Sequence, residues 1–172
     1  FGRDRQPEHR LIELFREHNE KCRKLSGIDM APATVERYET CLKHTQQFVR
    51  SAYGKEDIPL ATIDRKFIQD YEFYLKTVCR CCHNTTVKYL KNFRKIVLIA
   101  LNYRYITADP FAGMKFHLDE VERDFLEEHE IERIRTKDFG VKRINQVRDA
   151  FLFCCYTGLA FSDVKQLKLT HI

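Results

Sequence analysis

Apolar residues recur every three or four positions along most of this chain, which is the spacing of amphipathic helices. Over the first part of the chain this pattern predicts four helices, at about 7–25, 34–53, 65–78 and 84–106, with Pro7 in the first turn of the earliest one. Turn-forming pairs separate them at Ser26-Gly27, Tyr53-Gly54 and Ile58-Pro59. Only 6 Gly and 4 Pro are present, too few to turn an all-β sandwich every ~10 residues. The sequence therefore predicts an all-α fold.

The inward faces of these helices define the expected core. The second, third and fourth helices each carry one apolar stripe at helical spacing. Asp64 stands just before the third helix, where a carboxylate can accept a backbone N–H, so we expect it to be the N-cap. The stripe residues are Val35, Tyr38, Leu42, Thr45 and Val49, then Phe67, Ile68, Tyr71 and Leu75, then Val87, Leu90, Phe93, Val97, Ala100 and Leu101.

A second unit follows a break at Asp109-Pro110. Residues 111–124 show no helical period and are expected to be a linker between a helical domain at 1–110 and a unit at 125–172. In that unit we predict helices at about 127–136 and 145–156, the latter apolar enough to imply burial on most sides, and a short helix capped by Ser162. The unit is too small to close a core of its own, so we expect it to be the truncated start of a domain.

Composition bears on the setting of the protein. No apolar run approaches the ~18 residues of a membrane span, and the first residues are charged, unlike a signal peptide. The 7 cysteines include two adjacent pairs, which seldom close on themselves, so we expect reduced thiols. These features predict a cytoplasmic protein without a membrane partner. Because the sequence starts at Phe1, we expect it to be a piece of something longer.

Charge is distributed unevenly. The chain has 30 Lys and Arg against 25 Asp and Glu, a formal net charge of +5. Between Glu72 and Asp109 there is no carboxylate, a composition that favours a polyanion such as a phosphate backbone. The alternative is an ordinary solvated helix face, although such faces usually mix signs. The cations in this window are Lys76, Arg80, Lys88, Lys91, Arg94, Lys95 and Arg104.

Two helix faces carry candidate contacts to double-stranded DNA. Lysines there can bind phosphates, whereas Gln47 or Asn92 can read adenine edges if a helix enters the major groove. The candidates are Thr40, Lys43, His44, Gln47 and Arg50 on the second helix and Thr85, Lys88, Lys91, Asn92 and Lys95 on the fourth.

Two stretches resemble the tyrosine recombinase (phage integrase) family. The run from Asn84 to Arg94, with Asp109-Pro110-Phe111, is similar to the last core-binding helix and exit of integrases from mobile elements of Bacteroides-type bacteria. The run from Tyr156 to Val164 is similar to the first catalytic motif, usually Thr-Gly-Leu-Arg-x-Ser-Glu. The resemblance implies a four-helix, SAM-like core-binding bundle, then the first helices of a truncated catalytic domain.

The resemblance also implies a mechanism for the whole protein, which would cut and rejoin DNA strands through a 3′-phosphotyrosyl intermediate, as a tetramer. The phosphate-gripping arginine of the motif falls on Ala160, and Arg148, ~18 Å back along a helix, is a poor substitute. Tyr156 is expected in the core, and the nucleophile is expected beyond Ile172. We therefore assign no catalytic residue, and predict that this chain binds DNA and does not cleave it.

Neither a cofactor nor a metal is expected. Cys79, Cys81, Cys82 and His83 invite comparison with a zinc site, but four ligands in five residues cannot easily surround one ion. Two other functions stay open: a helical DNA-binding regulator without catalysis, whose second unit dimerises, and a helical protein-interaction scaffold whose basic face only aids solubility.

Overall fold

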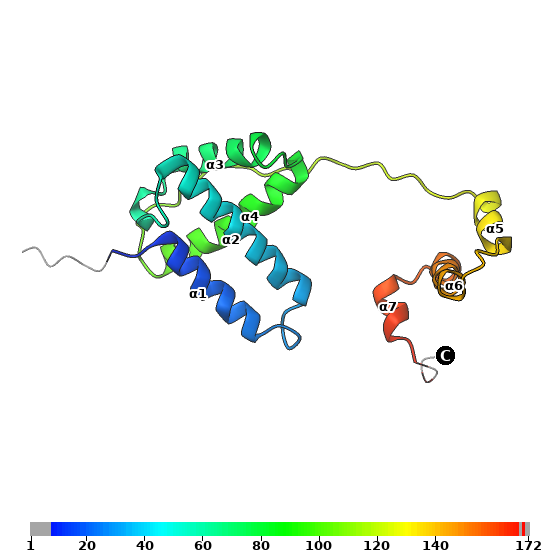
Figure 1. The fold of residues 1–172 in the computed structure, drawn as a ribbon. Helices are drawn as coiled ribbons and strands as arrows, with labels where there is room; N and C mark the ends of the chain where they lie inside the picture. The colour runs from blue at the N-terminus through cyan, green and yellow to red at the C-terminus, as the bar shows by residue number, and fades with distance from the viewer. Residues whose placement is uncertain (1–7, 169, 171–172) are drawn as a thin grey trace, which may run out of the picture. The chain divides into compact units, whose positions relative to one another are not determined.

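The computed structural model describes residues 8–168 and residue 170, and within them the chain forms helices and no strand. The all-α prediction is confirmed for this part of the chain. The chain divides into two compact units between Glu120 and Val121 (Figure 1). The elements are α1 (Leu11–Lys24), α2 (Pro32–Tyr53), a 3-10 turn (Leu60–Thr62), α3 (Arg65–Thr77), α4 (His83–Asn102), α5 (Glu128–Thr136), α6 (Lys142–Thr157) and α7 (Phe161–Gln166).

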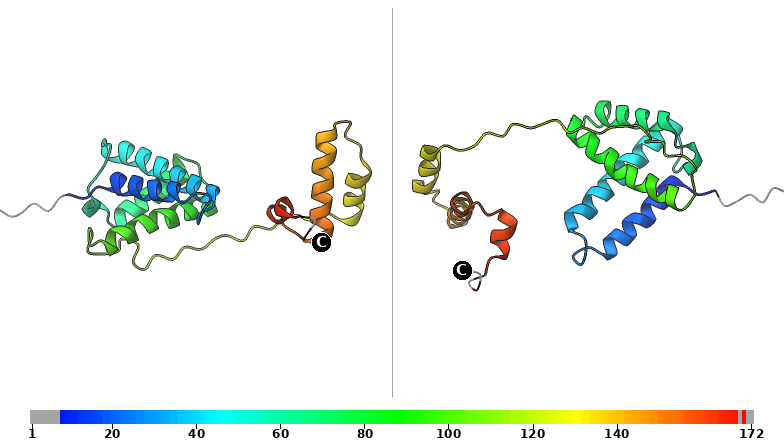
Figure 2. Two further views of the ribbon diagram at one scale, coloured as in Figure 1. Left: turned by 90° about the horizontal axis from the view of Figure 1, so that it is seen from below. Right: turned by 180° about the vertical axis from the view of Figure 1, so that it is seen from behind.

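In the first unit, α1 to α4 pack into a bundle around an aromatic core (Figure 2). The ring of Phe93 lies 5.8 Å from that of Phe67 and 5.4 Å from that of Tyr71, and none of the three is more than 1% exposed. Every predicted stripe residue is buried except Leu101, which packs against the core from a half-buried position. Phe48 and Cys41 join the core although neither lies on the predicted stripe. The periodicity therefore identified the correct faces.

Side chains from outside α1 and α3 fix where these two helices begin. α1 begins at Leu11 because Asp57, far along the chain, accepts the N–H groups of Ile12 at 2.8 Å and Glu13 at 3.1 Å. The predicted first turn at Pro7 lies outside the described residues. α3 has the predicted cap, since Asp64 accepts the N–H of Phe67 at 2.7 Å.

The fourth helix is shorter than its apolar pattern predicts. It ends at Asn102 rather than near Ile106, because Arg104 adopts a left-handed conformation with φ of 61°. The Arg104 N–H then donates to the carbonyl of Leu101, and the Tyr105 N–H to that of Ala100, both at 2.9 Å. These two bonds satisfy the last carbonyls of α4 in a Schellman arrangement.

The segment after α4 belongs to the bundle in its first part, contrary to the linker expected from residue 111. Phe111 is 0% exposed and its ring lies 6.1 Å from that of Phe93. The side-chain amide of Asn84 holds Asp119 by two hydrogen bonds, accepting its N–H at 2.8 Å and donating to its carbonyl at 2.9 Å. Turns and irregular chain can pack without any helical period, which is why the sequence pattern missed these contacts.

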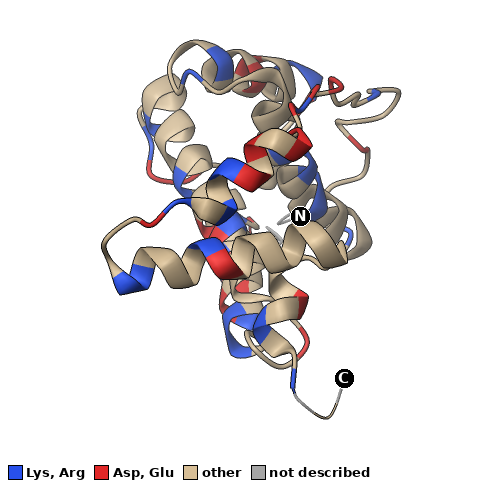
Figure 3. Ribbon diagram, turned by 90° about the vertical axis from the view of Figure 1, so that its right-hand side faces the viewer, with Lys and Arg blue, Asp and Glu red and all other residues tan. Residues whose placement is uncertain are grey.

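The second unit contains three helices and little core. α5 begins with a capping box in which Glu127 and Glu130 bond each other's backbone N–H groups, and α6 ends at Gly158 with φ of 71°. Figure 3 shows α6 lengthwise, with its charged residues confined to the N-terminal half and an uncharged C-terminal half. Leu152 is the one buried residue of α6 among those described.

Three expectations for this unit were wrong. The C-terminal half of α6 is not buried on most sides, because α5 and α7 are too short to cover it. Tyr156 is 66% exposed rather than part of a core. The N-cap of α7 is Ala160, without a side-chain hydrogen bond, whereas the hydroxyl of Ser162 lies inside the helix and donates to Asp163 at 3.4 Å.

Candidate nucleic-acid interface

Lys88, Lys91 and Lys95 form an exposed row along the outer side of α4. They stand three and four residues apart and therefore share one face of the helix. The opposite face, with Leu90 and Phe93, is buried against the bundle. None of the three ammonium groups forms an ion pair with a described residue. We call these residues the lysine row.

Two cations of the carboxylate-free stretch are nevertheless paired with carboxylates at its ends. Lys76 pairs with Glu72 at 2.6 Å, one turn back on α3. Arg94 lies 3.4 Å from Asp109, with its guanidinium 5.8 Å from the centre of the Phe111 ring. These two cations hold structure together, which leaves the lysine row as the unpaired charge on the face of α4.

The candidates on α2 divide into free and engaged residues. Lys43 and Gln47 are exposed. Arg50 is bound to Glu56, with Nε 3.0 Å from Oε2, and the Thr40 hydroxyl donates to the carbonyl of Glu36 at 2.9 Å. To contact DNA, Arg50 and Thr40 would first have to leave these partners, and Gln47 is hydrogen-bonded to His44, so Lys43 is the strongest candidate on α2.

His44 lies at the junction of α2 and α4 rather than on an open face. Its ring packs edge-on against Tyr89 at 4.9 Å, and its Nδ1 lies 3.4 Å from the sulfur of Cys79. Burial lowers the pKa of His44 and the charge of Lys43 lowers it further, while a hydrogen bond to Gln47 opposes both. Beside it the Cys41 thiol, whose pKa burial raises to about 12, donates to the carbonyl of Tyr89 at 3.4 Å. These contacts place the exposed part of α2 next to α4.

The N-terminus of α4 carries Cys82 and Thr85. Cys82 is the N-cap residue, and its sulfur lies 3.2 Å from the Thr85 hydroxyl. Hydrogen bonding to that hydroxyl and to backbone N–H groups at the helix start lowers the pKa of Cys82. Among the described residues, no group of three or more His, Cys, Asp and Glu side chains is arranged to hold a metal ion. Asn92, the remaining candidate, is half-buried on the lysine side of α4.

The structure adds one residue that the sequence did not single out, Lys21 on α1. Burial lowers the pKa of His18, opposed by a hydrogen bond to Asn19, and the charges of Lys95 and Lys21 lower it further. Lys21 therefore lies within electrostatic range of the same imidazole as the end of the lysine row. No signal in the sequence could have shown this, because α1 mixes acidic and basic residues throughout.

In the second unit, the motif between Tyr156 and Val164 holds no cation that could grip a phosphate. Ala160 begins α7. Arg148, on α6, is already engaged, since its guanidinium donates to a carboxylate oxygen of Asp149 at 2.9 Å and to the carbonyl of Lys137 at 2.6 Å.

The family model for the phage integrase SAM-like domain matches residues 10–118, which is most of the first unit. No curated protein and no solved structure matches the chain significantly. None of the helices in the described residues combines the length and the hydropathy that crossing a lipid bilayer requires.

Proposed function

Because the chain belongs to the phage integrase SAM-like domain family, we propose that its bundle binds double-stranded DNA through α2 and α4. The lysine row carries the proposal: three exposed cations on one helix face, none of them paired with a described carboxylate. Phosphates are the partners that such a row fits best.

The dimensions of the row suit a duplex. Lys88 and Lys95 are seven residues apart, about 10.5 Å along the helix axis. The major groove of B-form DNA is about 12 Å wide and admits one helix. With α4 at that groove, its lysines reach phosphates at the groove edge, and Lys43 on the neighbouring α2 adds a fourth cation. Gln47 and Asn92 are the residues with amide groups suited to adenine edges.

The number of unpaired cations sets the expected salt dependence. If Lys43, Lys88, Lys91 and Lys95 each contact one phosphate, log affinity falls against log salt with a slope of roughly 3.6. The slope is less steep than it would be if Arg50 also contacted a phosphate, because Arg50 is engaged with Glu56.

We further propose that this bundle serves a site-specific tyrosine recombinase of a mobile element of Bacteroides-type bacteria. That protein would act as a tetramer and form a 3′-phosphotyrosyl intermediate, which splits strand transfer into two covalent steps. Such chemistry needs cations where charge develops on the phosphate. Within the described residues Ala160 and the engaged Arg148 supply none, so the chain is expected to bind DNA and leave it uncut.

The binding proposal is tested by removing the row. A variant with Lys88, Lys91 and Lys95 changed to Gln is titrated with duplex DNA at several salt concentrations. We expect its salt slope to fall to roughly 0.9, because three of four counterion-releasing contacts are gone. The matched control changes Lys24, Lys66 and Lys76 to Gln, the same loss of charge from residues paired with carboxylates. Equal salt slopes for the two variants would refute the proposed face.

The absence of cleavage is tested separately. The chain is incubated with supercoiled plasmid carrying candidate sites, and the DNA is examined for nicks and for protein attached covalently to a 3′ end. We expect neither product. A covalent adduct would contradict the assignment of no catalytic residue and would require a nucleophile among the tyrosines of this chain.

A further inference from the structure

The outer side of α4 changes character along its length. Beyond the lysine row, the C-terminal half of the helix contributes to a shallow groove lined by Leu98, Ile99 and Phe116, with Lys91, Arg94, Lys95 and Asn102 around it. No carboxylate lines the groove. Leu98 is 39% exposed, and Phe116, which packs against the core from the segment after α4, is half-buried. The groove is thus apolar at its floor and positively charged at its edge.

Leu98 shares a face with the lysines. It stands seven residues after Lys91 and three after Lys95, so the three side chains lie on one side of the helix. A ligand that lies along the lysine row therefore meets Leu98 as well. The lysine row and Leu98 together therefore fit a ligand that presents anionic and apolar groups close to each other.

The major groove of an A·T-rich duplex presents both. Its edges carry phosphates, and each thymine places a 5-methyl group on the groove floor, where apolar side chains contact it. An acidic and apolar protein segment would satisfy the same description. We take the duplex as the occupant, because the DNA binding proposed for the same helix already places phosphates along the lysine row.

We infer that the C-terminal half of α4 recognises thymine 5-methyl groups, with Leu98 as the principal contact and Ile99 beside it. This inference rests on the proposed DNA binding of the same helix. It assigns to the helix a preference for A·T pairs that acts through apolar contact, separate from the phosphate contacts of the lysines. Leu98 acts as a specificity residue and the lysine row supplies affinity that does not depend on sequence.

The experiment compares two duplexes that differ only in this methyl group. A short duplex of alternating A·T pairs is prepared with thymine, and the same duplex with deoxyuridine, which lacks the 5-methyl group. We expect the intact chain to bind the thymine duplex about fourfold more tightly per methyl group contacted, the equivalent of burying one CH₂-sized group.

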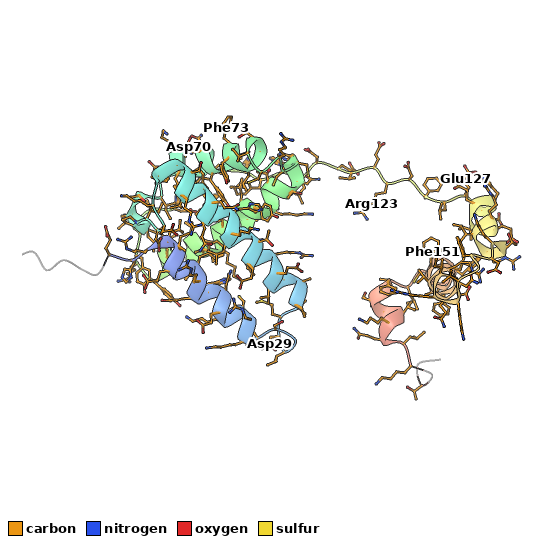
Figure 4. The ribbon with its side chains drawn as sticks, viewed as in Figure 1. Asp29, Asp70, Phe73, Arg123, Glu127 and Phe151 are labelled. Carbon is orange, nitrogen blue, oxygen red and sulfur yellow. The ribbon has the colours of Figure 1, made fainter. Side chains whose placement is uncertain are left out.

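Leu98→Ala should remove most of that discrimination while retaining the salt slope of the intact chain. Phe73→Ala is the matched control, because Phe73 is 68% exposed on α3 and its side chain extends outward from that helix (Figure 4). The control should discriminate between the duplexes as the intact chain does. Both variants alter exposed residues, so folding is checked by the helical circular dichroism signal.

The outcomes separate this inference from the DNA-binding proposal. If the intact chain binds neither duplex, the proposed function itself fails. If it binds both equally and the binding depends on the lysine row, DNA binding stands and the thymine contact is overturned. If it discriminates but Leu98→Ala discriminates equally well, the groove faces away from the bases and the inference is again overturned, which would leave the groove to a protein partner.

Discussion

Each of the two units of this chain contains an apolar helix, but the apolar side chains are buried in one unit and largely exposed in the other. In the bundle, the apolar side of α4 is covered by three other helices and by the segment around Phe111, so that Phe93 has no exposed surface. In the second unit, α6 is apolar over its C-terminal half, yet Phe151 (labelled in Figure 4) and Tyr156 are exposed, and Leu152 is its only buried residue among those described. Hydrophobicity along a helix therefore shows how much surface needs covering, and not whether nearby chain covers it.

The comparison also bears on function. A closed core holds the lysine row at fixed spacing, which is what recognition of a regular polyanion requires. In the second unit, the two positions considered for a phosphate-binding cation do not supply one, since Arg148 is engaged and Ala160 brings no charge. The DNA-binding proposal accordingly rests on the bundle alone, and the measurements below test whether the two units differ as much as their burial indicates.

The largest difference is expected between two phenylalanines. Phe93→Ala should lower the free energy of unfolding by about 5 kcal/mol, the upper end for a fully buried ring, because rings on every side hold the cavity open. Phe151→Ala, at a residue that is 42% exposed on α6, should lower it by less than about 1 kcal/mol. Both are measured by urea denaturation. Similar losses would mean that α6 has a core of its own.

Phe111→Ala sharpens the boundary between the units. We expect a loss of about 3 kcal/mol, somewhat less than for Phe93, because a segment between helices can relax into the space. Circular dichroism during chemical denaturation is again the readout, with Phe125→Ala as the control, since that ring is exposed within 121–172. If Phe111→Ala lowers the free energy of unfolding no more than Phe125→Ala does, residue 111 belongs to the linker as the sequence predicted.

Removing a helix cap should lower stability by less than removing a buried ring, and again by different amounts in the two units. Asp64→Ala removes the acceptor of the Phe67 N–H and should cost about 1 kcal/mol of stability, seen as a lower melting temperature. Ser162→Ala should leave that temperature unchanged, because Ser162 does not cap α7. Destabilisation by both would show that the cap of α7 was misassigned.

The smallest expected effect is the pH dependence of stability that arises from two histidines of the bundle. The pKa values of His18 and His44 are lowered in the folded chain, chiefly by burial. Their contribution to stability is therefore complete above the unfolded pKa of about 6.5 and is lost as pH falls through the lowered folded values. Unfolding free energies measured between pH 8 and 5 should decline at the acid end. A variant with both residues changed to Gln should decline less, and an equal decline would exclude these imidazoles as the cause.

How far the sequence predicts this molecule can be judged from particular residues. Periodicity located α2, α3 and α4 and most of their buried residues, because a helix packed on one side imposes that spacing. It extended α4 too far, because nothing in the pattern marks Arg104 as the left-handed residue that ends the helix. It also missed Phe111, since a turn between helices can bury a single residue without a period.

The candidate site was predicted in part for similar reasons. The outward position of Lys88, Lys91 and Lys95 follows from helix geometry, and the structure places all three in solvent. The engagement of Arg50 by Glu56 depends on how the chain turns after α2, and the place of His44 against Tyr89 depends on how two helices meet. Such contacts arise from tertiary structure and leave no local signature.

The two hydrogen bonds between Asn84 and Asp119 have a consequence for the chain that follows Asp119 and leads to the second unit. They fix the departure point of the polypeptide at the first turn of α4, one helical turn from Lys88. Residues 120–127 contain no helix and can span at most about 28 Å. This segment is a short linker that starts close to the lysine row. If the lysines bind a duplex, the length of the linker sets the effective concentration of the second unit near the bound phosphates.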